Sequence, residues 1–392
     1  MDASAPVPPR PITVLVVGAN GYLGSAVCRA FLRAAGSAFF FRVYGLVRRE
    51  STALALAADE VVPIVGSISD PESVTRTVLA QSPIWDVIVI CTEPSKLDLV
   101  SEEQHWHDLL LLVQGLAKSS ASSKGGPVRP MVLWSSGCKD YGTTKVHNDP
   151  ELQPHTEKSP LVPHPLVRGR LDGALRALEA AHKDGGKAGF DAAIVRPTPL
   201  FGYSGSYYGA AFDYMNEYVT AMRECDEKIL KIPSPEGTIM HGIHIDDCGD
   251  AYVALAQAAI FGNSPDPGLS NGKTTAGRAA IVGQAFNISG RRYETLNEVG
   301  SALAREYGFT SGVRFHVPTE ELPGALSSQN TDLVFGYSQW VSSDKIRAVT
   351  GWSDRRPLFH ENVGVFRLAY NAAEQGGNDN IAKTRRRMAG HW

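Results

Sequence analysis

The sequence has few cysteines, little net charge and no long apolar run, and each shortage excludes a class of protein. Its five cysteines are widely spaced and form no Cys-x-x-Cys pair. Neither a disulfide framework nor a zinc site is therefore predicted, and a reducing compartment such as the cytoplasm fits best. The formal net charge of −3 gives no general attraction to nucleic acid or to an anionic membrane. The apolar runs are too short to span a bilayer, and the start of the sequence lacks the apolar stretch of a secretory signal.

What the sequence does contain is the composition of a globular protein, with 43% hydrophobic and 20% charged residues among 392. Strand-like runs alternate with helical stretches such as residues 105–119 and 173–183. The strand-like runs cover residues 12–17, 40–47, 60–66, 85–91, 130–136 and 190–197. Alternation of this kind places parallel strands in one sheet with helices on both faces. The predicted fold class is therefore α/β, a doubly wound parallel sheet of the Rossmann type.

A glycine-rich loop follows the first strand-like run. Gly18, Gly21 and Gly24 form the pattern G-x-x-G-x-x-G in "VVGANGYLGSAV", between a β-branched run and a helical stretch. Glycines at this point allow a tight turn and let a pyrophosphate approach the backbone N–H groups at the positive end of a helix. The pattern predicts a dinucleotide site.

The end of the second strand-like run indicates which dinucleotide is bound. NAD-binding proteins usually place Asp or Glu there, on the ribose 2′-hydroxyl. Here Arg48 and Arg49 occupy the segment, and no acid precedes Glu50. Because a guanidinium can grip a 2′-phosphate with two hydrogen bonds, the sequence favours NADP(H) as the cofactor.

Taken together, several motifs resemble the extended short-chain dehydrogenase/reductase superfamily, in its NAD-dependent epimerase/dehydratase branch. The resemblance covers about residues 12 to 355 and is carried by "GANGYLG", "VLWSSGCKDYG", "IVRPTPLFG", "HGIHIDDCGDAYVAL", "AFNIS" and "VSSDKIRAVTGW". It implies a Rossmann domain followed by a smaller, mostly helical C-terminal substrate domain. The expected boundaries are 12–200 for the NADP-binding domain, with 238–262 and 283–290 returning to it; 201–237 and 291–375 for the substrate domain; and flexible tails at 1–11 and 376–392.

The resemblance also implies site residues. Ser136, at the end of the fifth strand, matches the family's catalytic hydroxyl, and Ser135 is the neighbouring alternative. His244 and Asp246 match positions that tie the two domains together. The other expected cofactor contacts are Asn20, Tyr22, Leu23, Ser67, Ile68, Cys91, Thr92, Arg170, Pro197, Thr198 and Leu200. The expected substrate contacts are Leu166, Tyr203, Tyr207, Tyr208 and His241.

The sequence departs from the family pattern at its usual Tyr-x-x-x-Lys pair. In the family, the lysine holds the cofactor ribose and lowers the pKa of the phenol, which exchanges a proton with the substrate oxygen. Here the corresponding positions are Leu166 and Arg170. Leu166 can do no acid–base chemistry, and Arg170 can bond a ribose but not shuttle protons. A literal match, "YGTTK" from Tyr141 to Lys145, lies in the loop after Ser136. It matches the "YG" that is common after this strand in the family, which favours a chance match, but Tyr141 is also a candidate relocated proton donor because this loop is expected to border the substrate cleft.

Three classes of function remain open. The first is an NADPH-dependent reductase with a water relay or a substitute proton donor, for which Tyr203, Tyr207, Tyr208 and His164 are further candidates. The second is an isomerase, lyase or cyclase that retains NADP(H) and polarises a carbonyl with Ser136 and Tyr141. The third is a nucleotide-sensing regulator without catalysis. The aromatic loop at 201–214 favours a small apolar or aromatic substrate, similar to a secondary metabolite, and a homodimer is a possible assembly. No metal, nucleic acid or membrane partner is expected.

Overall fold

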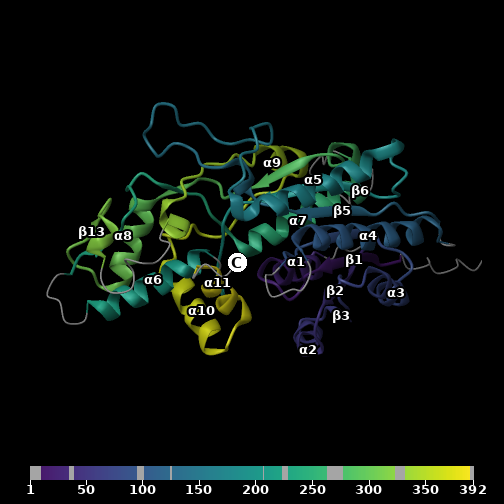
Figure 1. Cartoon of the computed structure of the whole chain (residues 1–392), viewed down its shortest axis with the longest axis horizontal. Helices are drawn as coiled ribbons and strands as arrows, with labels where there is room; N and C mark the ends of the chain where they lie inside the picture. Colours follow the sequence, from purple (N-terminus) through teal and green to yellow (C-terminus); the bar gives the residue numbers. More distant parts are fainter. Residues whose placement is uncertain are drawn as a thin grey trace, which may run out of the picture.

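The computed structural model describes residues 10–34, 39–94, 101–123, 126–205, 207–222, 228–262, 277–322 and 332–388. Figure 1 shows two parts side by side, a sheet with flanking helices on the right and a mostly helical part on the left. The sheet has seven parallel strands in the order β11-β6-β5-β4-β1-β2-β3. Its strands are β1 (Ile12–Val17), β2 (Phe41–Val47), β3 (Val62–Val65), β4 (Val87–Ile90), β5 (Met131–Ser135), β6 (Asp191–Pro197) and β11 (Ala285–Ile288). The predicted doubly wound α/β fold is thereby confirmed.

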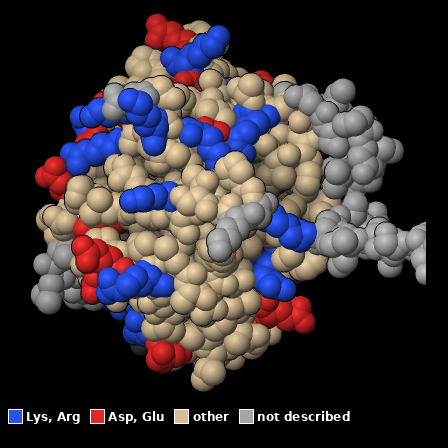
Figure 2. All heavy atoms as spheres, turned by 90° about the vertical axis from the view of Figure 1, so that its right-hand side faces the viewer, with Lys and Arg blue, Asp and Glu red and all other residues tan. Residues whose placement is uncertain are grey.

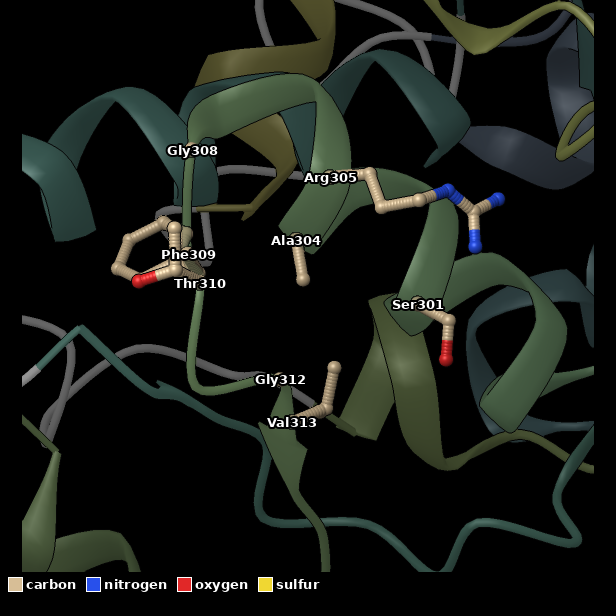
Figure 3. A pocket seen from close by; sticks show the side chains of 8 residues that line it. All are labelled: Ser301, Ala304, Arg305, Gly308, Phe309, Thr310, Gly312 and Val313. Atoms are coloured by element: carbon tan, nitrogen blue, oxygen red, sulfur yellow. The ribbon is translucent and has the colours of Figure 1, made fainter.

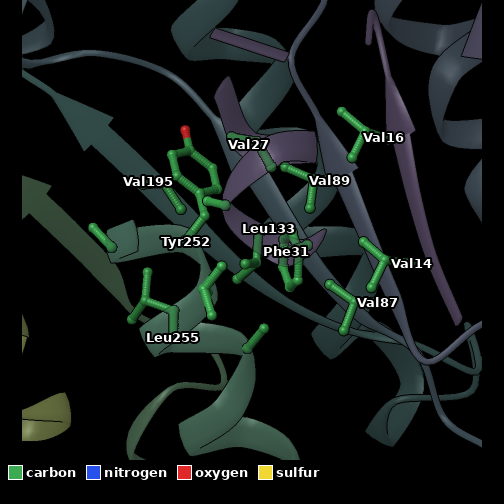
Figure 4. Packing of buried hydrophobic residues seen from close by; sticks show 14 of the residues in the cluster. Val14, Val16, Val27, Phe31, Val87, Val89, Leu133, Val195, Tyr252 and Leu255 are labelled. Atoms are coloured by element: carbon green, nitrogen blue, oxygen red, sulfur yellow. The ribbon is translucent and has the colours of Figure 1, made fainter. Parts of the chain in front are cut away.

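The sheet is buried on both faces because most positions of its strands are apolar. In β1, Val14 and Val16 face one helical layer while Leu15 and Val17 face the other, as the two-residue period of a strand requires. The first layer consists of α1 (Tyr22–Arg33) and α7 (Ile245–Phe261), and Figure 4 shows its side chains packed on the strands. The second consists of α3 (Pro71–Gln81), α4 (Glu102–Ala121) and α5 (Arg168–His182). The helix α2 (Glu50–Ala58) follows β2.

The mostly helical part, here called the substrate part after the substrate domain that the sequence predicts, has a separate aromatic core, which includes Phe201, Phe212, Phe359 and Phe366. Its helices are α6 (Tyr207–Ala221), α8 (Leu296–Tyr307), α10 (Val363–Gln375) and α11 (Asp379–Met388), and α9 (Asp344–Thr350) packs beside α7 and β11. The short strands are β7 (Leu200–Phe201), β8 (Leu230–Lys231), β9 (Ile239–Met240), β10 (Ile243–His244), β12 (Glu294–Thr295) and β13 (Val313–Arg314). Single turns are η1 (Cys138–Tyr141), η2 (Pro165–Val167), η3 (Lys183–Gly185), η4 (Arg278–Ala280), η5 (Thr319–Glu321) and the π-helical η7 (Asp332–Gly336).

Parts of both segments that the sequence predicts as flexible tails are held by contacts with the rest of the protein. At the C-terminal end, α11 is a helix docked on the substrate part, because Ile381 is buried in the aromatic core and Arg385 bonds Asp213 of α6. At the N-terminal end, residues 1–9 lie outside the described residues, but Arg10 makes two hydrogen bonds of 2.7 Å to Asp86.

A long irregular loop, residues 142–164, connects η1 to η2 and arches over the top of the molecule in Figure 1. The loop runs along residues 338–342. The Thr144 amide donates to the Ser338 carbonyl at 2.9 Å, and the His155 amide donates to the Trp340 carbonyl at 2.9 Å. The loop therefore joins the carboxyl end of β5 to the substrate part.

The surface matches the small net charge of the sequence. On the face shown in Figure 2, Lys and Arg side chains are interspersed with Asp and Glu side chains. In the described part of the chain, no helix is long and apolar enough to cross a membrane.

A buried ion pair in the substrate part predicts how stability varies with pH. Glu294 is fully buried and accepts hydrogen bonds from the His360 amide and from His360 Nδ1, both at 2.7 Å. The hydrogen bond from the His360 side chain raises its pKa above 6.5. The pair stabilises the fold fully below that ordinary pKa, and its contribution is lost as the pH rises through the raised pKa. We expect a loss on the order of 1 kcal/mol, because part of the ring is open to solvent screening. Urea unfolding from pH 5.5 to 9 measures this loss in the free energy of unfolding. A His360→Gln variant should lack the dependence of that free energy on pH. An unchanged slope in that variant would contradict the assignment.

Candidate active site

The turn after β1 has the geometry of a pyrophosphate cradle. Gly18 has φ +83°, which favours glycine. A Cβ on Gly24 would lie 2.2 Å from the Gly18 carbonyl oxygen, so α1 can pack this closely only with glycine there. Gly21 caps α1 without any side-chain hydrogen bond, and the first turn of the helix has no acidic residue. The positive end of α1 is therefore not neutralised locally and fits an anionic ligand.

The other predicted cofactor contacts lie at the same carboxyl edge of the sheet. Arg49 caps α2 directly after β2, and Ser67 follows β3 with its hydroxyl 2.7 Å from the Ser69 hydroxyl. Cys91 follows β4, and its Sγ lies 3.7 Å from the Ser135 Oγ. The structure brings the following to this edge or to the turns beside it: Asn20, Leu23, Arg48, Ile68, Thr92, Pro197, Thr198 and Leu200.

Two of the predicted contacts have protein partners beside α1. The Tyr22 hydroxyl donates to the Gly202 carbonyl at 2.7 Å. The hydroxyl of Tyr203, predicted to bind substrate, donates to Asp246 Oδ2 at 2.8 Å. His244 caps α7 by accepting from the Asp246 amide through Nδ1 at 3.2 Å. The contacts of Tyr22, Tyr203 and His244 join the glycine turn to the substrate part. The side chain of Tyr207 lies outside the described residues.

Both candidate serines are engaged with protein partners. The Ser136 hydroxyl is 4% exposed and donates to Asp140 Oδ2 at 2.6 Å. The Ser135 hydroxyl lies 2.7 Å from the Tyr252 hydroxyl of α7. A substrate carbonyl would have to compete with a carboxylate for the Ser136 proton. This geometry weakens the predicted catalytic role of Ser136.

The hydroxyl of Tyr141 is buried and bonded to two side chains of the protein. Its hydroxyl accepts from Arg196 Nη1 and donates to Asn287 Oδ1, both at 2.8 Å, and the residue is 2% exposed. Burial raises the pKa of its phenol. Lys145 pairs with exposed Glu151 at 3.3 Å and does not join Tyr141. The contacts argue against Tyr141 as the proton donor, and the sequence match to Tyr-x-x-x-Lys does not form a catalytic pair.

A buried carboxylate organises this edge. Asp140 is fully buried, with Arg196 Nε 3.1 Å from its Oδ2 and Arg170 Nη2 3.7 Å from its Oδ1. Arg170 also donates to Glu93 Oε1 at 2.9 Å. A Cβ on Gly137 would lie 2.6 Å from Arg170 Nη2, so the guanidinium lies directly against this backbone. Leu166, four residues before Arg170, is 41% exposed.

Lys139 is a candidate that sequence reasoning missed. It is 8% exposed, and its Nζ lies 3.8 Å from the centroid of the Tyr337 ring. Burial and the nearby Arg170 charge lower the pKa of Lys139 to about 8. A lysine in a loop is ordinarily solvated. The only sequence signal is its place three residues after Ser136, in the loop that follows β5.

Lys139 lines a narrow pocket between the sheet and the substrate part. The wall also contains Pro199, Tyr208, Met240, His241, Val334, Tyr337 and Gln339. Among the described residues, three buried oxygens of this wall have no hydrogen-bond partner: the hydroxyls of Tyr208 and Tyr337 and Oε1 of Gln339. Buried polar groups are normally paired, so these atoms offer hydrogen bonds to a ligand.

His241 contributes to the wall as a neutral ring. Its Nδ1 accepts from the Val341 amide at 3.2 Å, and its Nε2 lies 3.1 Å from the Gly290 carbonyl. Burial lowers the pKa of His241 to about 4. Since Nδ1 accepts from backbone, the ring proton lies on Nε2 and is donated to the Gly290 carbonyl, so the ring shapes the pocket and offers no free nitrogen to a ligand.

A larger groove of about 440 Å³ lies elsewhere. It is formed by the end of α8 and the turn leading to β13, at the opposite end of the molecule from the sheet (Figure 1). In Figure 3, Ala304 and Val313 point into this groove, and Arg305 extends away from it. The groove has no group suited to acid–base catalysis in its lining, so the pocket of Lys139 is the candidate active site.

Comparisons with known proteins agree with this architecture. The family model "NAD dependent epimerase/dehydratase family" matches residues 14–266. The dTDP-glucose 4,6-dehydratase of Bacillus anthracis, solved with NAD, has a TM-score of 0.61 at 14% identity, covering 93% of this chain and 98% of its own. The UDP-Glc/GlcNAc 4-epimerase of Campylobacter jejuni has a TM-score of 0.59 at 18% identity, covering 93% and 99%. At such identities, the similarity establishes the fold alone. No curated protein matches the chain significantly.

The carboxylate of Asp140 should be essential to stability. An Asp140→Asn variant leaves buried Arg196 without its counter-charge, and we expect the unfolding free energy to fall by about 3–5 kcal/mol. Asp172 provides a matched control, because it pairs with Arg168 of the same helix turn at 3.2 Å on the exposed surface. Asp172→Asn should cost less than about 1 kcal/mol. Equal losses in the two variants, measured by chemical denaturation, would contradict the role of Asp140.

Proposed function

The chain belongs to the NAD-dependent epimerase/dehydratase family, as its motifs predict, and we propose that it is an NADP(H)-dependent reductase of a small, apolar carbonyl compound. The observation that carries the proposal is the buried ammonium group of Lys139. It lines a pocket together with Pro199, which belongs to the turn after β6, and that turn is expected to lie near the nicotinamide. The pocket thus offers an acid beside the predicted hydride source.

The residues at the carboxyl edge fit a dinucleotide. Gly18 and the N-terminus of α1 would hold the pyrophosphate, Arg48 and Arg49 the 2′-phosphate, and Arg170 a ribose hydroxyl. The bound nicotinamide would supply a hydride to the carbonyl carbon. The solved relative from Bacillus anthracis is in complex with NAD, which supports a nicotinamide cofactor for this fold. The preference for the phosphorylated form rests on the two arginines.

Lys139 would donate the proton that completes the reduction. With a pKa of about 8, the side chain is mostly protonated at pH 7, yet it gives up its proton more readily than an exposed lysine. A general acid works best when its pKa lies near the operating pH. The ammonium would pass a proton to the substrate oxygen, and the amine would then be reprotonated from solvent. The ammonium also stabilises the negative charge that develops on this oxygen.

The pocket wall indicates the substrate class. Tyr208, Met240 and Val334 provide an apolar surface for a ring or a branched chain. The hydroxyls of Tyr208 and Tyr337 can donate to substrate oxygens, while Gln339 Oε1 can accept from a substrate hydroxyl. A ketone on an aryl or alicyclic ring that carries a further hydroxyl group has a partner for each of these atoms, and the pocket, about 30 Å³ in this structure, would have to widen to admit the ring. We propose hydroxylated cyclic or aryl ketones as the substrate class.

The same lysine supports one alternative. A pKa of about 8 leaves part of Lys139 as a neutral amine, which can remove a proton next to a carbonyl. An isomerase or lyase that retains NADP(H) would use it in this way. Product formation without net oxidation of the cofactor would identify this alternative, and cofactor binding without any product would indicate a regulator.

Lys139 should therefore control turnover. Lys139→Met keeps an unbranched apolar side chain and removes the acid, so kcat should fall about 10²–10⁴-fold, the usual contribution of a general acid. Lys145→Met, at an exposed lysine six residues further along, should retain activity. NADPH oxidation with a panel of hydroxylated aryl ketones measures both variants.

The pH profile provides a second readout on Lys139. Because the acid form is required, kcat/KM should fall as the pH rises through about 8. Lys139→Arg should move this limb to higher pH, since a guanidinium stays protonated. If Lys139→Met is active, or if the limb stays in place in Lys139→Arg, another group is the proton donor.

Arg48 and Arg49 should determine the preference for NADP(H). Replacing both with Ala should weaken NADP(H) binding at least about tenfold, because each charge-assisted hydrogen bond contributes about 1.5–3 kcal/mol. Binding of NAD(H), which lacks the 2′-phosphate, should change little. Arg42 is exposed on β2 and provides an Arg42→Ala control for net charge. Equal weakening of both cofactors in the double variant, measured by calorimetry, would argue against a 2′-phosphate site.

A further inference from the structure

The C-terminal helix reaches the edge of the sheet where the cofactor's adenosine ribose is expected. Asp379, the first residue of α11, places Oδ2 3.0 Å from Nη2 of Arg49. Arg49 directly follows β2 and caps α2. In dinucleotide-binding folds, the residues after the second strand bind the 2′ position of the ribose. No acid precedes Glu50 at the end of β2. Asp379, 330 residues after Arg49 in the chain, places a carboxylate beside this position.

The position of Asp379 is fixed by the rest of α11. Ile381 is 3% exposed and belongs to the aromatic core of the substrate part. Arg385 donates to both carboxylate oxygens of Asp213 in α6 and also bonds Glu374 in α10. The helix thus extends from the substrate part to the cofactor edge with contacts at both ends.

We propose that Asp379 is a specificity-determining residue for the 2′ group of the cofactor. Its carboxylate competes with the 2′-phosphate of NADP(H) for the Arg49 guanidinium. Toward NAD(H), the same carboxylate stays in place and accepts a hydrogen bond from the 2′-hydroxyl. Asp379 therefore lowers the preference for NADP(H) that Arg48 and Arg49 create. The inference rests on the NADP(H) site proposed above.

The exposure of the ion pair makes this competition reversible. The side chains of Arg49 and Asp379 are each 63% exposed, and such pairs are weak because water and salt screen them. A phosphate carries more charge than a carboxylate and presents more acceptor oxygens to a guanidinium. The phosphate can therefore displace Asp379 from Arg49, at a cost in affinity that NAD(H) does not incur.

The test compares Asp379→Asn with the unmodified protein. Kd values for NADP⁺ and NAD⁺ are measured by calorimetry at low and at high salt. The variant should bind NADP⁺ about twofold to fivefold more tightly, the equivalent of a released surface ion pair, and NAD⁺ no more tightly than before. The change should shrink at high salt. Asp379→Glu keeps the charge and should retain the original ratio of the two Kd values.

A matched control separates this effect from a change in net charge. Glu321 pairs with Arg314 on the exposed surface of the substrate part, and Glu321→Gln removes one negative charge there. If Glu321→Gln and Asp379→Asn lower the Kd for NADP⁺ equally, the proposal is wrong. It would also fail if Asp379→Asn left the ratio of Kd values unchanged while the Arg48/Arg49 double variant altered it. If the double variant leaves that ratio unchanged, the NADP(H) site itself is wrong and the role of Asp379 falls with it.

Discussion

The buried carboxylate of Asp140 is the interaction on which the active-site edge depends. It holds Arg196 and Ser136 by hydrogen bonds and faces the guanidinium of Arg170. These contacts fix the turn η1 at the end of β5. The turn directs Tyr141 inward, toward Arg196, and presents Lys139 to the pocket. The network occupies the expected catalytic hydroxyls, and Lys139 is the basic side chain of the pocket wall whose pKa, about 8, lies near neutral pH.

The fold could be predicted from local features of the sequence. A strand buried on both faces needs apolar residues at consecutive positions, and β1 and β4 show this directly. The glycine turn could be predicted because its demands are local as well: Gly18 needs a positive φ and Gly24 must lack a Cβ. Motifs distributed along the chain identified the family, which the family model confirms.

The arrangement of the site could not be predicted, because tertiary contacts decide it. Nothing near Lys139 in the sequence shows that Tyr337 lies over its ammonium group, so its burial and lowered pKa were not foreseeable. Tyr141 matched a motif by spacing, but Asn287 and Arg196 engage its hydroxyl from two other strands. The polar sequence of α11 is typical of a solvated tail, but the buried side chain of Ile381 and the hydrogen bonds of Arg385 to Asp213 dock it.

The proposed reductase would use Lys139, positioned beside the buried charge network of Asp140, as its proton donor. The central claim of this proposal is that hydride passes from the bound cofactor to a carbonyl carbon in the pocket of Lys139. The most direct measurement uses NADPH carrying deuterium at the transferable position of the nicotinamide, with hydroxylated aryl ketones as substrates. The account predicts an alcohol with deuterium on the former carbonyl carbon and one oxidised cofactor for each product. A rearranged or cleaved product without deuterium, with the cofactor still reduced, would contradict it.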